Sequence, residues 1–189
     1  AYFLLAALFH QQERVDAESV WVEAVSRIIS GGYTFLLEQE RTLAFPLLAT
    51  HLSSENPNAA SVSETLLGHL ERVPPPSLHV VTLGKFEVRQ GTRTILDHAW
   101  RQRRAGELFR LLLISPSRSL FRDQVAEALW PEKSPGSTPA LFHKATSALR
   151  HALEPDLQDR FPSRYLTVED KRATLHLPPG SWVDFAAFE

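Results

Sequence analysis

At 189 residues the chain is long enough for one large domain or two small ones. Apolar residues make up 43% and charged residues 22% of it, as in ordinary globular proteins, which excludes disorder along the whole chain. The absence of cysteine excludes disulfides and cysteine-based zinc sites, and it fits a cytoplasmic location.

The net charge of −2 conceals a difference between the two halves of the chain. Residues 1–76 hold 4 basic and 9 acidic side chains, whereas residues 77–189 hold 16 basic and 13 acidic ones. A mildly basic second half suits a polyanionic partner, because neutralising phosphates releases counterions and favours binding.

The first part of the chain has the periodicity of helices. Apolar spacing predicts helices over 2–12 and 17–30, and Gly31-Gly32 ends the second one. Two such helices form the hairpin unit of tetratricopeptide-like repeats. The first nine residues are apolar but too short to span a bilayer and lack a basic leader, so we expect a core helix and no membrane partner.

Two further helices are predicted before a boundary. One covers 40–52 and is bent or begun near Pro46, and the other covers 62–72; a polar stretch over 53–61 separates them. Three consecutive prolines then predict a stiff, extended linker over 74–77.

Beyond the linker the pattern changes from helical to alternating. Three short strands over 78–83, 85–89 and 93–96 predict a small antiparallel sheet. Three helices follow it, over 103–114, 120–129 and 137–153. After Pro155 a hairpin is predicted, with strands over 165–168 and 173–177 joined by the charged tip 169–172.

The helix over 137–153 has one apolar and one polar side. Ser137 suits the N-cap and Pro139 the first turn. The apolar stripe consists of Phe142, Ala145 or Thr146, Leu149 and Leu153. The other side carries no carboxylate and consists of His143, Lys144, Ser147, Arg150 and His151. A helix of about 25 Å can lie along a DNA major groove; an ordinary amphipathic helix with a solvated polar side is the alternative.

The order sheet, helix, helix, loop, helix, hairpin is that of a winged helix-turn-helix with an extra N-terminal sheet. Residues 78–184 resemble the OmpR/PhoB-type winged helix found in SARP-type (antibiotic regulatory protein) activators. The matching stretches are Leu83 to Val88, Trp100 to Ala105, Ala128 to Pro131 and Ala148 to Pro155, and Val183 to Glu189 resembles the entry to the bacterial transcriptional activation domain of that family.

We therefore predict an α+β chain in four parts. A TPR-like helical segment covers 1–73 and a Pro-rich linker covers 74–77. A winged-helix DNA-binding domain covers 78–180, and the start of an activation domain covers 181–189. Residues 1–52 resemble the end of the helical repeat region in MalT-type regulators. The lack of an initial methionine leads us to expect a piece of a longer protein.

The resemblance implies that the recognition helix 137–153 enters the major groove and the wing 165–177 lies on the flanking groove. Arg150 would contact phosphate, while Lys144 and Ser147 would face the DNA. Many relatives carry an arginine where this chain has Ala148, which weakens the case for guanine recognition by arginine. The base-edge candidates are then Lys144, Ser147 and His143, although His143 also fits a plain surface histidine.

Other basic side chains complete the predicted DNA-binding set. His151 shares the polar side of the recognition helix. Lys171 and Arg172 at the wing tip are candidates for the minor groove or its phosphates. Three basic residues stand at the start of the first helix of the domain: Arg101, Arg103 and Arg104. They would either contact the DNA backbone or be exposed to solvent at the start of that helix.

The predicted function is sequence-specific binding of double-stranded DNA by a transcription regulator, an activator by resemblance. RNA polymerase and a second copy on direct repeats are the further partners that this implies. The alternative is a protein–protein interaction module with a degenerate winged helix.

We expect no enzyme, because the chain lacks a GxSxG elbow, a P-loop, an HExxH motif and cysteine. No catalytic residue, metal or cofactor is predicted. His10, His51 and His69 are interpreted as scattered residues with no partner at metal-ligand spacing.

Overall fold

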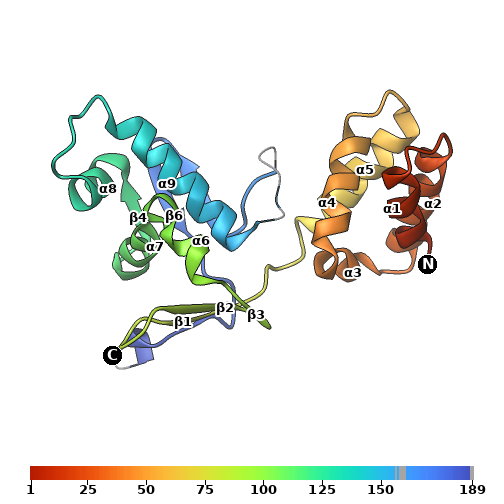
Figure 1. The fold of residues 1–189 in the computed structure, drawn as a ribbon. Helices are drawn as coiled ribbons and strands as arrows, with labels where there is room; N and C mark the ends of the chain where they lie inside the picture. The colour runs from red at the N-terminus through yellow and green to blue at the C-terminus, as the bar shows by residue number, and fades with distance from the viewer. Residues whose placement is uncertain (156, 158–160, 188–189) are drawn as a thin grey trace. The chain divides into compact units, whose positions relative to one another are not determined.

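The computed structural model describes residues 1–155, 157 and 161–187. It is an α+β chain, as predicted, and it forms two compact units (Figure 1). The first unit is Ala1–Pro74, and the second begins at Pro75, so the boundary lies inside the predicted linker.

The first unit is entirely helical. Its helices are α1 (Tyr2–Gln11), α2 (Ala17–Ser30), α3 (Thr34–Gln39), α4 (Arg41–Leu52) and α5 (Pro57–Leu70). Helix α1 packs on α2 and α4, and α5 packs on α2, α3 and α4. The fully buried side chains at the centre of this unit include Trp21, Val25, Leu47, Leu48 and Leu66.

The structure of this unit differs from the sequence prediction at three places. Helix α3 was not predicted at all. The polar stretch 53–61 is not a loop throughout, because the Asn56 side chain accepts hydrogen bonds from the amides of Asn58 and Ala59 and so begins α5 at Pro57. Helix α1 is not a core helix: only its two small residues Ala6 and Ala7 are buried, whereas Leu4 is 59% exposed.

The second unit mixes helices with short strands. Its strands are β1 (Leu78–Val81), β2 (Glu87–Gln90), β3 (Arg93–Thr94), β4 (Ser119–Phe121), β5 (Leu166–Glu169), β6 (Arg172–Leu175) and β7 (Trp182–Val183). Its helices are α6 (Asp97–Arg101), α7 (Ala105–Ile114), α8 (Arg122–Leu129) and α9 (Thr138–Leu153), with 3₁₀ turns η1 (Gln102–Arg104) and η2 (Phe185–Ala187).

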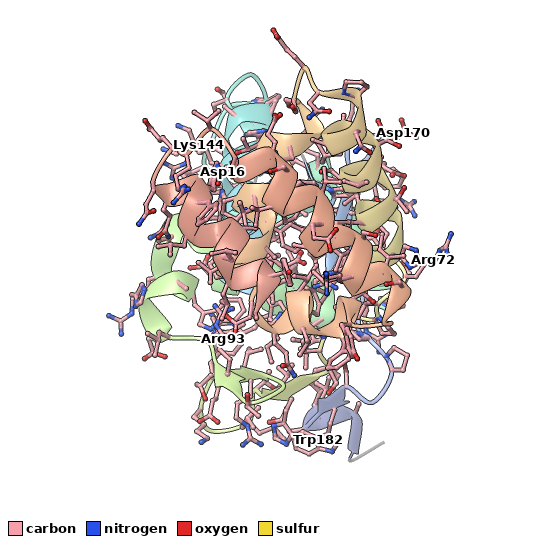
Figure 2. All side chains as sticks on the ribbon, turned by 90° about the vertical axis from the view of Figure 1, so that its right-hand side faces the viewer. Asp16, Arg72, Arg93, Lys144, Asp170 and Trp182 are labelled. Atoms are coloured by element: carbon pink, nitrogen blue, oxygen red, sulfur yellow. The ribbon has the colours of Figure 1, made fainter. Side chains whose placement is uncertain are left out.

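The strands form two sheets. The first has the order β3-β2-β1-β7, with β1 and β7 parallel and the other pairs antiparallel. Its edge strands carry Arg93 and Trp182 (Figure 2). The second sheet is antiparallel, with β6 between β4 and β5. The sequence predicted β1, β2, β3 and the hairpin; it missed α6, β4 and β7, and β7 extends the sheet beyond the boundary predicted at residue 180.

Asp184 fastens the end of β7 to the loop after β1. Its carboxylate accepts hydrogen bonds from the amides of Thr82 and Leu83, both at 2.6 Å, from the Thr82 hydroxyl at 2.7 Å and from the Phe185 amide at 2.9 Å. Burial by itself raises the pKa of this carboxyl, but the hydrogen bonds from Leu83, Thr82 and Phe185 lower the pKa of Asp184 to about 2. The carboxylate is therefore ionised at neutral pH.

His51 is buried in the first unit at 3% exposure. Its ring stacks on Trp21 with centroids 5.2 Å apart and lies 6.0 Å from the ring of His10. Neither ring nitrogen has a hydrogen-bond partner among the described residues. The fold thus brings together the rings of His10 and His51, two residues that lie far apart in the sequence. Burial, with a smaller effect from His10, lowers the pKa of His51.

We expect the first unit to lose stability as the pH falls because of His51. The unfolded histidine titrates near pH 6.5 and the folded one lower, so the unfolded chain binds the proton first. The contribution of His51 to the free energy of unfolding is completely present above about pH 7 and decreases as the pH falls below about 6.5. Urea unfolding of the chain, followed by NMR signals of α2, measures this change from pH 7.5 to 5.

His51→Phe should flatten that dependence because the phenyl ring fills the stacked position without binding a proton. His69→Phe, at a half-buried position of α5, is the control for the loss of a histidine and the added phenyl ring. Equal pH profiles for His51→Phe and the parent would contradict the assignment.

Candidate nucleic-acid interface

Helix α9 is oriented by its buried side. Phe142, Ala145, Leu149 and Leu153 are all buried, and the helix packs against α7, α8 and β5. This confirms the predicted apolar stripe. Thr146 also lies inward, and its hydroxyl donates to the Phe142 carbonyl at 3.0 Å, so burial leaves it hydrogen-bonded. The side of α9 opposite this stripe consequently faces away from the core.

The start of α9 differs in detail from the predicted cap. Ser137 occupies the N-cap position, but its hydroxyl donates to the Ser134 carbonyl at 2.8 Å rather than accepting from the helix amides. Thr138 donates to the same carbonyl at 3.3 Å. The preceding loop, rather than a side-chain cap, thus fixes where α9 begins.

Four of the five predicted polar side chains on α9 can reach a partner from the surface. His143, Lys144 and His151 are exposed and Ser147 is half-buried. Helix α9 contains no aspartate or glutamate, so no carboxylate of its own opposes the charge of Lys144. This side is suited to hydrogen bonding with a polar, anionic surface.

Arg150 has a partner inside the protein. It is half-buried, and its Nη2 donates to the Phe161 carbonyl at 2.6 Å. Nearby, the buried carboxylate of Glu154 accepts hydrogen bonds from the Ser163 hydroxyl and from the Arg164 amide at 3.1 Å. The end of α9 is therefore fastened to the segment that leads into the hairpin.

The hairpin of β5 and β6 ends in a two-residue turn at Asp170 and Lys171, shorter than the predicted tip 169–172. Both turn residues have positive φ, 48° and 63°, as a type I′ turn requires. The Lys171 carbonyl accepts a hydrogen bond from the Arg122 amide at 2.7 Å, which ties the tip to the start of α8. The Arg172 guanidinium lies 4.1 Å from the centre of the Phe121 ring.

The basic stretch before α7 divides into side chains with different surroundings. Helix α7 begins at Ala105 rather than at the predicted residue 103, because Arg103 and Arg104 adopt positive φ values of 47° and 63°. Arg104 donates to the Leu129 carbonyl at 2.5 Å and to Glu107 at 3.1 Å, so it joins α7 to α8. Arg101 and Arg103 are exposed, and Arg101 lies 3.9 Å from Asp97.

Two residues that support the hairpin were missed by the sequence analysis. Phe121 underlies Arg172, and Arg122 holds the turn through its amide. Phe121 is the last residue of β4 and Arg122 follows it; β4 has only three residues and so gives too little alternation to be recognised.

Within the part of the chain that the structure describes, there is no group of three histidine, aspartate or glutamate side chains that could hold a metal ion. None of the described helices is long and apolar enough to cross a membrane. Comparison with protein-family models, with curated proteins and with solved structures finds no match.

Arg150→Ala should destabilise the second unit by about 1–3 kcal/mol, because it leaves the Phe161 carbonyl without its charged donor. Lys144→Ala, on the exposed side of the same helix, should change the free energy of unfolding by less than about 0.5 kcal/mol. Urea unfolding followed by tryptophan fluorescence measures both. Equal unfolding midpoints for the two variants would show that the Arg150 hydrogen bond does not stabilise the fold.

Proposed function

We propose that the second unit is a winged-helix domain that binds double-stranded DNA sequence-specifically in a transcription regulator. The order of elements supports this proposal: α7, β4, α8 and α9 are followed by the β5–β6 hairpin, and β6 lies between β4 and β5. In winged helices the last helix of this series enters the major groove and the hairpin reaches the flanking backbone.

The observation that carries the proposal is the two-sided character of α9. One side is buried in the core, and the other presents Lys144, His143 and Ser147 without any carboxylate. A helix of 16 residues is about 24 Å long and, with its side chains, about 10–12 Å across, so it can lie in a major groove that is about 12 Å wide. Lys144 would donate to base-edge acceptors or phosphate, and Ser147 can both donate and accept.

The hairpin would contribute orientation more than charge. Lys171 and Arg172 are exposed, but Glu169 and Asp170 stand beside them, so the four residues have no net charge. A tip without net charge contributes little to the non-specific attraction of DNA. Phosphate contacts by the tip would instead set the position of α9 in the groove.

Arg150 would act mainly as a positioning residue. Its bond to the Phe161 carbonyl holds the segment after α9, and through it the approach to the hairpin. The phosphate contact expected from the family resemblance would then fall chiefly to Lys144. Binding of RNA polymerase and pairing of two copies on direct repeats belong to the same proposal and come from that resemblance. A cytoplasmic location also belongs to the proposal, and it rests on the absence of cysteine.

A second candidate function is protein binding by the first unit. Its surface exposes large apolar side chains on α1 and α3, and the exposed fraction is 59% for Leu4, 47% for Leu8 and 52% for Phe35. Exposed apolar side chains in such number favour a contact surface. In this alternative the chain would bind a protein and would not bind DNA.

Selection from a random duplex library at two salt concentrations tests the proposed function directly. We expect retention at low salt and enrichment of one sequence motif. Retention of duplexes without enrichment of a motif would mean that the site is only a weakly basic surface. No retention of duplexes at low salt would favour the protein-binding alternative.

Lys144→Ala should weaken binding to the enriched duplex and lower the slope of log affinity against log salt by about one phosphate contact. Lys85→Ala, which removes an exposed lysine from the loop between β1 and β2, is the matched control and should leave the slope unchanged. If both variants lower the slope equally, α9 is not the contact surface.

Substitutions at the turn residues Asp170 and Lys171 distinguish effects on the stability of the second unit from effects on DNA binding. Lys171→Gly should raise the stability of the second unit by about 0.5–1 kcal/mol, since glycine adopts positive φ without strain, yet it should weaken DNA binding several-fold. Asp170→Gly relieves the same strain but keeps the lysine and removes a negative charge, so it should strengthen binding. Weaker binding by both variants would exclude a charge effect of the tip; duplex titrations at fixed salt measure it.

A further inference from the structure

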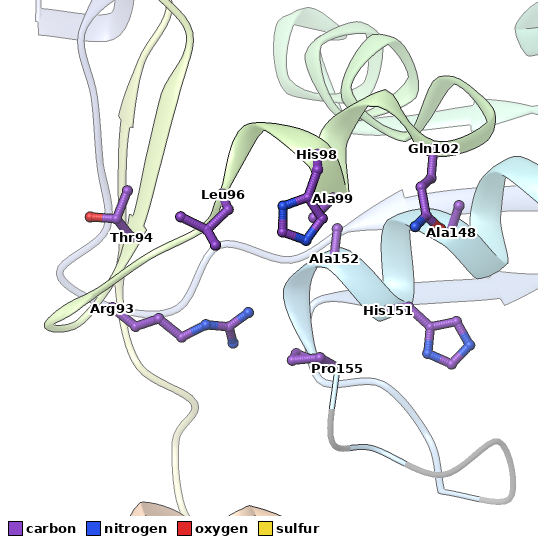
Figure 3. Close-up of a pocket in the computed structure, with 10 residues that line it drawn as sticks. All are labelled: Arg93, Thr94, Leu96, His98, Ala99, Gln102, Ala148, His151, Ala152 and Pro155. Carbon is purple, nitrogen blue, oxygen red and sulfur yellow. The ribbon is translucent and has the colours of Figure 1, made fainter.

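A groove lies beside the C-terminal half of α9, on the side of the segment that runs from β3 through α6 (Figure 3). Its volume is about 470 Å³, within the range of about 300–1,000 Å³ that is usual for small-molecule sites. All of the lining residues belong to the second unit.

The groove has an apolar floor. Ala148 and Ala152 of α9 form its base, and both are buried almost completely. Ala99 adds to the floor from α6, and Leu96 is 61% exposed at its side. The small alanine side chains create the space, and the exposed leucine offers apolar surface that solvent now covers.

Hydrogen-bond donors surround this floor. Figure 3 shows the Arg93 side chain extending from β3 toward α9, with His98 and Gln102 on the α6 side and His151 on the α9 side. Arg93 donates one hydrogen bond, from Nη1 to the Gln90 side chain at 3.2 Å, and a guanidinium has five N–H donors. No carboxylate is among the described residues that line the groove.

We infer that this groove binds a small organic anion that combines an apolar, flat body with one carboxylate. The body would lie on the alanine floor against Leu96, and the carboxylate would accept hydrogen bonds from the Arg93 guanidinium. Planar guanidinium and carboxylate groups match in a two-point contact, which fixes the orientation of the ligand. The histidines and Gln102 supply further donors at the rim.

Inorganic phosphate or a DNA backbone phosphate could also approach Arg93, but neither uses the apolar floor. The two sources of negative charge are therefore distinguishable. The inference concerns binding in the absence of DNA, so it does not depend on the proposed function.

The test is a set of NMR titrations of the ¹⁵N-labelled chain with benzoate, benzyl alcohol and inorganic phosphate. Benzoate should shift the amide signals of Ala99, Ala148 and Ala152 saturably, at concentrations at least several-fold lower than the other two probes. Equal responses to benzoate and phosphate would identify a plain anion contact, and a response that does not saturate would mean unspecific association; either result overturns the inference.

Variants on exposed positions test the geometry without disturbing the core. Arg93→Gln should weaken benzoate binding by roughly fivefold and leave benzyl alcohol unaffected, as expected for a solvent-exposed ion pair. Leu96→Ser should weaken both. Arg89→Gln removes an exposed arginine from the neighbouring strand β2 and is the matched control. Equal losses in Arg89→Gln and Arg93→Gln would assign the effect to overall charge and overturn the inference.

Discussion

Burial of one side of α9 is the constraint on which the second unit depends. Phe142, Leu149 and Leu153 fill the space among α7, α8 and β5, and loss of a single buried leucine side chain typically costs about 2–5 kcal/mol. Because a helix repeats every 3.6 residues, this packing also fixes which side chains point outward. The polar side of α9 is thus oriented by the core before any partner is bound.

Hydrogen bonds connect the beginning and the end of the second unit. Asp184 holds the Thr82 and Leu83 amides, and the Ser181 hydroxyl accepts a hydrogen bond from the Leu78 amide at 2.9 Å. The Tyr165 hydroxyl donates to the Pro76 carbonyl at 2.7 Å, which links the hairpin to the end of the linker. These bonds join segments about 90 to 100 residues apart in the chain, so they tie the sheet and the hairpin to the end of the linker.

The sequence predicts long, periodic elements well and short ones poorly. Helices α1, α2 and α9 span two to four turns with a clear pattern, and their bounds lie within a residue or so of expectation. Strands β4 and β7 have three and two residues, and they exist only through tertiary pairing with β6 and β1. The sequence shows which side chains are charged but not which backbone carbonyls lie near them in the fold, so the internal hydrogen bonds of Arg150 and Arg104 could not be predicted. The contact of His10 with His51 could not be predicted either, because it depends on how the helices pack.

The basic side chains of the second unit therefore differ in what they can give to an outside partner. Arg104 and Arg150 donate to carbonyls of their own chain, and Arg172 lies over Phe121, whereas Lys144 extends from the surface of α9. The formal excess of positive charge overstates the attraction that this surface exerts on a polyanion. Where internal partners hold part of the positive charge, non-specific affinity is reduced, so discrimination among sequences would have to come from hydrogen bonds at base edges and from the fit of α9 in the groove.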